Sequence, residues 1–266
     1  MRVSDVYAID LIKSNYIREL ISKGKREDSR GLLDFRAIKI KPGIIQNAEG
    51  SAQVDLGNTR VLAGVKMGVG EPMEDTPDMG TIAMSAELLP AASADYETGP
   101  PSPESIELAR VVDRGIRAGN CVDLSSLLID KGKCWNIFVD IYVLNYDGNL
   151  FDASCIAAMS SLVNTKVPGY EDEKELHDKR VKNLKIDNIV TSATFGKIGK
   201  HLVLDPDRSE ENAMLARFTV ATDEKFIRAM QKGLSGSLYK AEIESMVDTA
   251  LEKHKHVKKI IEESKA

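Results

Sequence analysis

Apolar and polar residues alternate along much of the first half of the chain, which predicts β-strands there. Alternation runs through residues 36–40 and 81–88, and through a hairpin whose arms meet at Gly57-Asn58, a favoured two-residue turn. The positions expected to face inward in this hairpin are Ala52, Val54, Leu56, Val61, Ala63 and Val65. Residues 135–144 predict a central strand that is apolar on both faces, because Phe138 and Leu144 alternate with the inward series.

Helical spacing appears at four places. Ser14 is expected to cap a helix that ends at Gly24, and Asp152 to cap another that packs through Ile156 and Met159. A long helix is predicted from about Ser237 to near the end of the chain. The clearest start signal is Ser102 followed by Pro103, because serine caps a helix and proline suits its first position.

The second half repeats this plan of strands followed by a helix. Strands are expected within residues 188–196, 201–205, 215–222 and 225–231. The stretch 168–185 is charged and only weakly periodic, so we place a domain boundary near residue 180. The predicted organisation is two α/β (α+β) domains, at residues 1–180 and 181–266.

Three arginines share one face of the helix that follows Pro103. Arg110, Arg114 and Arg117 lie at i, i+4 and i+7, beside an apolar stripe formed by Leu108, Ala109, Val112 and Ile116. Like charges this close repel one another, and Glu107 and Asp113 offset only part of that charge. The two interpretations are a solvated ion-pair network, in which Arg117 could pair with Asp113 at i+4, and a site for an anion.

Charge and cysteine content restrict the class of protein. The net charge of −5 means that any nucleic-acid binding must come from a local patch or an assembly of chains. Cys121, Cys134 and Cys155 form no close pair and fit neither a disulfide framework nor a zinc site. The first residues lack the apolar run of a signal peptide, so a soluble, cytoplasmic protein without membrane contact is expected.

Four motifs, in order, resemble the RNase PH family: GSAQVDLGNTRVLAGVKMG, ELARVVDRGIRAG, IFVDIYVLNYDGNLFDASCIAA and AMQKGLSGSL. The similarity runs from about residue 13 to the final helix. It implies a larger domain like domain 2 of ribosomal protein S5 and a smaller RNase PH C-terminal domain. It also implies a ring of six such folds that degrades RNA from its 3′ end by phosphorolysis.

The chain departs from the active members of that family at three places. Their phosphate-binding stretch, Gly-Gly-Thr/Ser-Arg, is matched here by residues 148–151, where Leu150 and Phe151 replace the hydroxyl and the arginine and Asp152 follows. Arg217 lies near the position of their general acid, and Lys66 begins the segment where an arginine is expected. An apolar pair cannot hydrogen-bond phosphate, so the comparison predicts a subunit that does not catalyse.

The resemblance is greatest to the non-catalytic RNase PH-like subunits of archaeal exosomes. Arg110 and Arg114 match the family's pair that reaches the RNA backbone, with Arg117 as a further candidate. The implied partners are a catalytic RNase PH-like subunit in a trimer of heterodimers, cap proteins with S1, KH or zinc-ribbon domains, and single-stranded RNA. No cofactor is expected in this chain; inorganic phosphate, with Mg²⁺ as a candidate ion, would serve the catalytic partner.

Other functions stay open on the residues alone. The chain could be a phosphate-dependent 3′–5′ exoribonuclease in its own right, if other residues replace the missing phosphate ligands. It could bind another anion such as a nucleotide, although no G-x-x-x-x-G-K loop is present. The four acids at 205, 207, 210 and 211 could form a Mg²⁺ site, but a surface loop is the preferred interpretation, and Cys155 is expected in the core.

Overall fold

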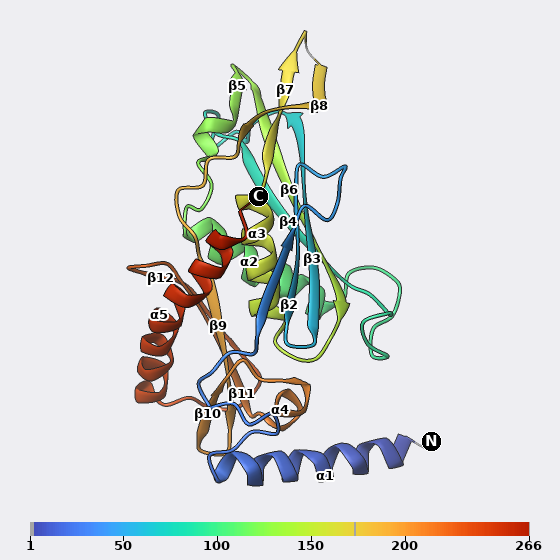
Figure 1. Cartoon of the computed structure of the whole chain (residues 1–266), viewed down its shortest axis with the longest axis vertical. Coiled ribbons are helices and arrows are strands. Elements are labelled where there is room, and N and C mark those ends of the chain that lie inside the picture. The colour runs from blue at the N-terminus through green and yellow to red at the C-terminus, as the bar shows by residue number, and fades with distance from the viewer. Residues whose placement is uncertain (1–2, 173, 266) are drawn as a thin grey trace.

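Two β-sheets lie one above the other along the long axis of the molecule, with helix α3 (Leu150–Val163) packed against both of them (Figure 1). The computed structural model describes residues 3–172 and 174–265. In the larger sheet the strand order is β1 (Ile38–Pro42), β2 (Gly50–Leu56), β3 (Thr59–Gly70), β6 (Lys133–Asn145) and β4 (Thr81–Leu88), with β5 (Leu128–Asp130) beside β6. All neighbours are antiparallel except β4 and β6.

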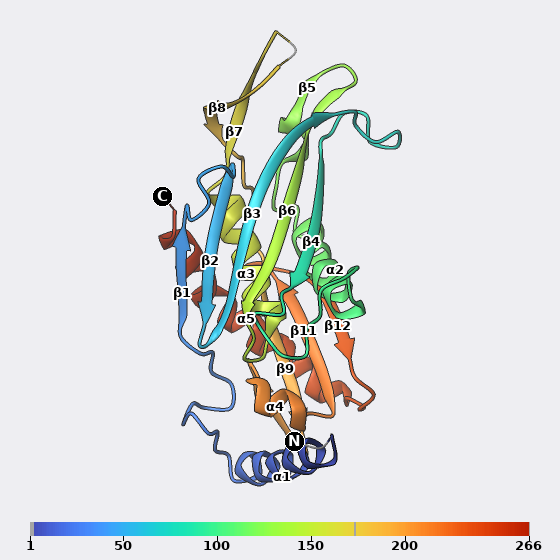
Figure 2. The ribbon, with the colours of Figure 1, turned by 90° about the vertical axis from the view of Figure 1, so that its right-hand side faces the viewer.

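The smaller sheet has the order β10 (His201–Leu204), β9 (Thr191–Ile198), β11 (Ala216–Thr222) and β12 (Ile227–Gly233), all antiparallel. Helix α5 (Lys240–Glu263) lies along one side of this sheet, and α1 (Val3–Ser22) crosses beneath it (Figure 2). Ile17 and Ile21 of α1 pack in an apolar cluster with Ile198, Val203 and Ala213. The N-terminal helix is therefore attached to the sheet formed by the C-terminal half of the chain.

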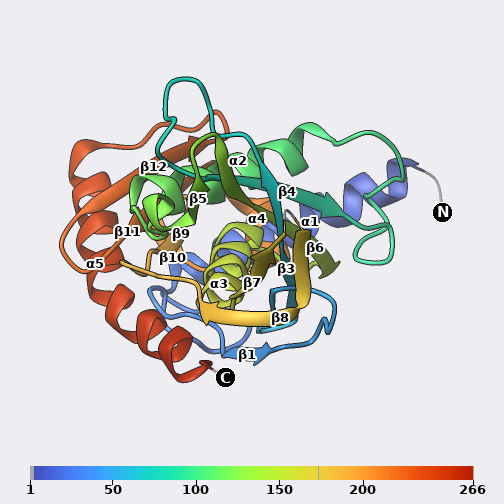
Figure 3. The same ribbon diagram turned by 90° about the horizontal axis from the view of Figure 1, so that it is seen from above.

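Helix α3 is buried on every side, as the view along the long axis shows (Figure 3). Its sequence is rich in Ala, Ser and Cys, and these small side chains let the larger sheet on one side and β9 on the other approach closely. Gly50 marks one such approach, because a Cβ atom there would lie 2.4 Å from the carbonyl oxygen of Ser161. Cys155 is buried in this core, as predicted.

Many predicted elements are confirmed. The six inward positions of the β2–β3 hairpin are each 0% exposed. Helix α2 (Pro103–Ala118) begins as expected, since the Ser102 hydroxyl accepts a hydrogen bond from Ser105 N at 3.2 Å and Pro103 occupies the first turn. Its apolar stripe is buried, and α2 packs against β4 of one sheet and β12 of the other.

Two predicted helix starts are wrong. Helix α1 begins at Val3, so Ser14 lies inside it, where its hydroxyl donates to the carbonyl oxygen of Asn212 at 3.3 Å. Helix α3 is capped by Asn149, which adopts a left-handed conformation (φ 54°), and Asp152 lies in the first turn. Asparagine adopts this conformation more readily than most residues because its short side chain can bond locally.

Two strand predictions are also corrected. Phe138 on the outer face of β6 is 45% exposed, so the central strand of this chain is covered on one face only. The charged stretch after α3 forms a hairpin of β7 (Lys166–Glu171) and β8 (Lys174–Asn183), which extends from one end of the molecule (Figure 1). Residue 180 lies within β8, and the domain boundary near it stays a prediction.

Helix α5 contains a buried titratable group. His254 is 1% exposed; its Nδ1 lies 2.9 Å from the Thr191 hydroxyl, and its Nε2 has no partner among the described residues. Burial, assisted by the charge of Lys258, lowers the pKa of His254 below the ordinary 6.5. The imidazole of His254 therefore binds a proton more readily in the unfolded chain than in the folded one. As the pH falls through 6.5 and below, His254 should lower the free energy of unfolding.

We expect His254→Asn to lose less stability than the wild type between pH 7.5 and pH 5.5. The asparagine amide can still form a hydrogen bond with Thr191, but asparagine cannot take up a proton when the chain unfolds. Urea unfolding at both pH values measures the difference, with His256→Asn as the control because His256 is exposed on the opposite side of the same helix. If the free energy of unfolding falls equally in the wild type and in His254→Asn between these pH values, His254 is not the cause of the pH dependence.

No helix within 3–172 and 174–265 combines the length and the apolar character needed to cross a membrane.

Candidate nucleic-acid interface

The three arginines of α2 are exposed, but they differ in how they are held. Arg110 has no hydrogen-bond or ion-pair partner among the described residues. Arg114 makes one long hydrogen bond, 3.4 Å from Nη1 to the side-chain oxygen of Gln231 on β12. Arg117 forms an ion pair with Asp113 at 2.9 Å and also donates to the carbonyl oxygen of Ile82 at 2.6 Å. The Arg117–Asp113 pair, which the sequence left open as one of two interpretations, is present, and the first two guanidinium groups remain available to an external anion.

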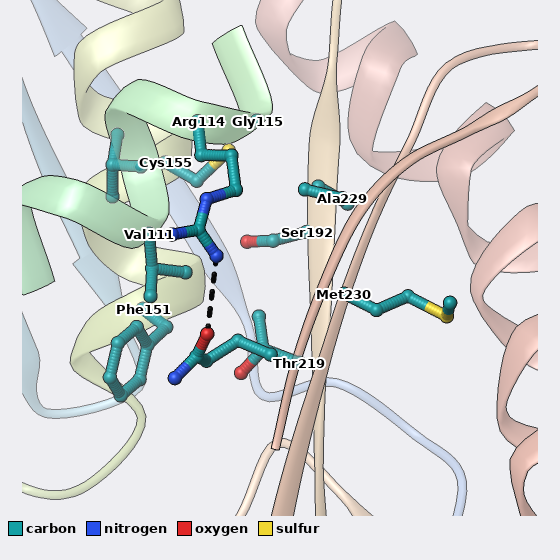
Figure 4. Close-up of a pocket in the computed structure, with 12 residues that line it drawn as sticks. Val111, Arg114, Gly115, Phe151, Cys155, Ser192, Thr219, Ala229 and Met230 are labelled. Carbon is teal, nitrogen blue, oxygen red and sulfur yellow. Dashed lines mark hydrogen bonds between the residues drawn. The ribbon is translucent and has the colours of Figure 1, made fainter. Parts of the chain in front are cut away.

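Arg114 lies over a small apolar hollow between α2, α3 and β12 (Figure 4). Its side chain points from α2 toward the sheet, with Val111 and Phe151 on one side and Thr219 nearby. The hollow has a volume of about 10 Å³, which is room for about one water molecule. The hollow is thus narrow and mainly apolar in its lining, and Arg114 is the one charged side chain among the described residues that line it.

Phe151 and Arg217 lie in direct contact beside this hollow. The guanidinium carbon of Arg217 is 4.2 Å from the centre of the Phe151 ring, a distance typical of cation–π stacking. Arg217 also pairs with Glu107 of α2 at 2.5 Å. Thus two positions that the sequence comparison assigned to phosphate binding and acid catalysis do come together, as an aromatic ring stacked on a guanidinium group that is already paired with Glu107.

The N-terminus of α3 is occupied by side chains of the chain itself. The backbone N–H of Asn149 donates to Glu211 at 2.9 Å, and the side-chain oxygen of Asn149 lies 3.4 Å from the backbone nitrogen of Asp152. Asp152 is 0% exposed and accepts from Thr194 N and from Thr194 Oγ1, each at 2.8 Å. Burial raises the pKa of Asp152 to about 6 and raises that of Glu211. A helix N-terminus favours an anion, and here internal acids take that place.

The acids after β10 belong to a buried network, so the expected surface loop is wrong. Asp205 is 0% exposed, with Arg36 Nη2 at 2.8 Å and Arg30 Nη1 at 3.1 Å. Glu210 is 1% exposed, and Arg26 Nε donates to it at 2.8 Å. Helix α4 (Arg208–Ala213) was not predicted; Asp207 and Glu210 form its capping box. These carboxylates are compensated by arginines and caps and not arranged as ligands of a metal ion.

Lys66 does not line the hollow. Its ammonium group pairs with Glu49 at 2.8 Å, at the base of the β7–β8 hairpin, where His177 also reaches Glu49. The third position at which the sequence departs from active relatives is therefore committed to a structural contact in this chain.

Comparison with known proteins identifies the family of the chain. Residues 34–168 match the model of the 3′ exoribonuclease family, domain 1, and residues 188–253 match domain 2 of the same family. The chain belongs to the RNase PH family. Membership agrees with the two sheets and their helices, and it confirms the predicted fold.

Within the family, the chain is similar to archaeal exosome proteins over almost its whole length. It is 44% identical to exosome complex component Rrp42 of Thermococcus gammatolerans over 268 residues, covering 98% of both chains. It is 42% identical to exosome complex component Rrp42 of Methanothermobacter thermautotrophicus, covering 94% of each. A chain of the Archaeoglobus fulgidus exosome with RNA bound to the active site superposes with a TM-score of 0.88 at 40% identity, covering 95% of this chain and 98% of that one.

Sequence reasoning found the arginine face but missed what surrounds it. In the sequence Arg217 stands out only as an unsuitable replacement for an acid, and nothing there predicts its stacking on Phe151 or its pairing with Glu107. Gln231 was not singled out either. The pairing of β11 with β12 is the signal that could have pointed to Arg217. In this register Arg217 lies opposite Gly233, and the glycine leaves space for the guanidinium group.

Proposed function

We propose that this chain is a non-catalytic, RNA-binding ring subunit of an archaeal exosome. The observation that carries the proposal is the contrast at one site. Arg110 and Arg114 are exposed and largely uncommitted, while the neighbouring positions 151 and 217 hold a phenylalanine and an arginine stacked on each other instead of a phosphate-binding arginine and a general acid. Similarity to Rrp42 components and to a chain of an exosome solved with RNA supports the same assignment.

The proposed task is to hold RNA beside the active site of a catalytic RNase PH-like partner. Guanidinium groups suit this task because they are permanently charged and can donate two parallel hydrogen bonds to phosphate oxygens. Contacts of this kind orient a strand without reading its bases. Arg110 and Arg114 are the main contacts, and Arg117 contributes less because Asp113 already holds it.

The proposed assembly is a ring of six folds built as a trimer of heterodimers with the catalytic subunit. Cap proteins with S1, KH or zinc-ribbon domains would deliver single-stranded RNA to it. In the partner, an oxygen of inorganic phosphate attacks the last phosphodiester, which releases a nucleoside diphosphate and leaves a shortened RNA with a free 3′ hydroxyl. Inorganic phosphate and Mg²⁺ belong to that reaction, and this chain needs neither cofactor.

The decisive test is a phosphorolysis assay with and without the partner. The purified chain, given single-stranded RNA, inorganic phosphate and Mg²⁺, is expected to release no nucleoside diphosphates. Adding the catalytic subunit from the same organism should give phosphate-dependent release that exceeds that of the catalytic subunit alone. A mock preparation from cells lacking the chain controls for host phosphorolytic enzymes. Release by the lone chain above that control would instead establish an independent exoribonuclease.

A further inference from the structure

Arg217 connects four elements at the edge of the arginine face. It stands on β11, stacks on Phe151 of α3, and pairs with Glu107 of α2. Opposite it on β12 is Gly233, where an added Cβ atom would lie 2.7 Å from Arg217 Nη2 and 3.0 Å from its guanidinium carbon. The guanidinium group therefore has one well-defined position, between a ring and a glycine.

Glu107 and Asp113 each lie three residues from Arg110 on α2, and because Arg117 already holds Asp113, Glu107 is the acid of the two that could compete with RNA for Arg110. At this spacing Glu107 and Arg110 share a face of the helix, so their side chains could pair. The same helix shows that such pairs do form, because Asp113 holds Arg117 four residues further on. Glu107 instead lies 2.5 Å from Arg217, and Arg110 has no ion-pair partner within the part of the chain that the structure describes.

We propose that Arg217 is a positioning residue for RNA binding: it sequesters Glu107, so that Arg110 stays free for phosphate. The inference rests on the proposed RNA-binding function. Arg217 does not itself contact RNA, because it is only 15% exposed and its Nε is buried. It acts by neutralising and holding Glu107, while Arg117 holds Asp113, the other acid three residues from Arg110.

The test is a double-mutant cycle on RNA affinity. The wild type, Arg217→Met, Glu107→Gln and the double variant are each reconstituted with the catalytic subunit, and binding of a labelled oligo(A) strand is titrated at several salt concentrations. Arg217→Met is expected to weaken binding about fivefold and to lower the salt slope by about 0.7, the share of one phosphate on a single strand. Adding Glu107→Gln should restore both quantities, because the released acid is then gone.

Each outcome decides the proposal. If Arg217→Met weakens RNA binding and Glu107→Gln does not restore it, Arg217 has a merely structural role and the proposal is overturned. RNA affinity equal to that of the wild type in Arg217→Met would also overturn the proposal. If Arg217→Met fails to fold, Arg217→Lys takes its place: it keeps the charge near Glu107 without the planar stack, and affinity near wild type is expected. Loss of affinity in Arg217→Lys that Glu107→Gln does not restore counts against the proposal.

Failure of the proposed function is distinguishable from failure of this inference. If replacing Arg110 and Arg114 themselves leaves RNA binding unchanged, the RNA-binding function is wrong whatever Arg217 does. If those replacements weaken binding and the cycle shows no rescue, only the role of Arg217 is wrong.

Discussion

Replacing Arg110 and Arg114 together with alanine is expected to weaken RNA binding by the reconstituted complex roughly tenfold or more at 0.1 M salt. Each exposed guanidinium group that leaves removes a charge-assisted contact to a phosphate. Fewer counterions are then released on binding, so the slope of log K against log salt should shrink by about 1.4, or about 0.7 for each lost contact to a single strand. Fluorescence anisotropy with a labelled single-stranded RNA, repeated across salt concentrations, measures both quantities.

Arg117→Ala is the matched control on the same helix. Arg117 is also exposed, but Asp113 and the carbonyl oxygen of Ile82 already hold its guanidinium group. We expect a smaller loss of affinity and a smaller change in salt slope than for either of the other arginines. Two results would contradict the proposed ranking of these residues. One is an unchanged RNA affinity and salt slope in the double variant, and the other is a loss of affinity in Arg117→Ala as large as that in Arg110→Ala or Arg114→Ala.

The largest effect on stability is expected from Asp205→Ala. The carboxylate is 0% exposed, and it accepts hydrogen bonds from Arg36, Arg30 and the side-chain nitrogen of Asn149. Removing it leaves the buried guanidinium group of Arg36 with only the distant carboxylate of Asp147 as a counter-ion, and breaking a buried ion pair costs about 3–5 kcal/mol in measured cases. The free energy of unfolding in urea should fall by about that amount, with an m-value close to that of the wild type.

Asp147→Asn provides the comparison, because Asp147 also faces Arg36. Its side chain is 35% exposed, and the separation of 3.9 Å is at the limit of an ion pair. Exposed pairs contribute about 0–1 kcal/mol, so this variant should stay within 1 kcal/mol of the wild type. Similar losses in the two variants would show that burial does not set the strength of this network.

Local signals in the sequence were sufficient wherever one face of an element is buried. Alternation located β2 and β3, and the serine–proline start with a four-residue stripe located α2. These patterns are informative because residues three or four positions apart share one face of a helix, and residues two positions apart share one face of a strand. The strands β7 and β8 were not predicted, because their hairpin is mostly charged and presents no alternating apolar face.

The features that were missed depend on partners far away in the chain. Asn149 caps α3 and also bonds Asp205, which is 56 positions later. Arg26 reaches Glu210 across 184 positions, so no local pattern could show that this acid is buried. In the candidate site, helix spacing predicted the arginine face, but Glu107 and Arg217 are 110 positions apart and meet only when α2 packs on the smaller sheet.

The stacked pair of Phe151 and Arg217 also couples two of the positions at which the chain departs from the active members of the family. Phe151→Arg alone would bring two positive groups face to face at the present separation of 4.2 Å, and Arg217→Asp alone would set a new acid against Glu107. Each single step is unfavourable in the background that the other residue creates. Substitutions at these two positions are therefore expected to show reciprocal sign epistasis, which favours their joint replacement over either single change.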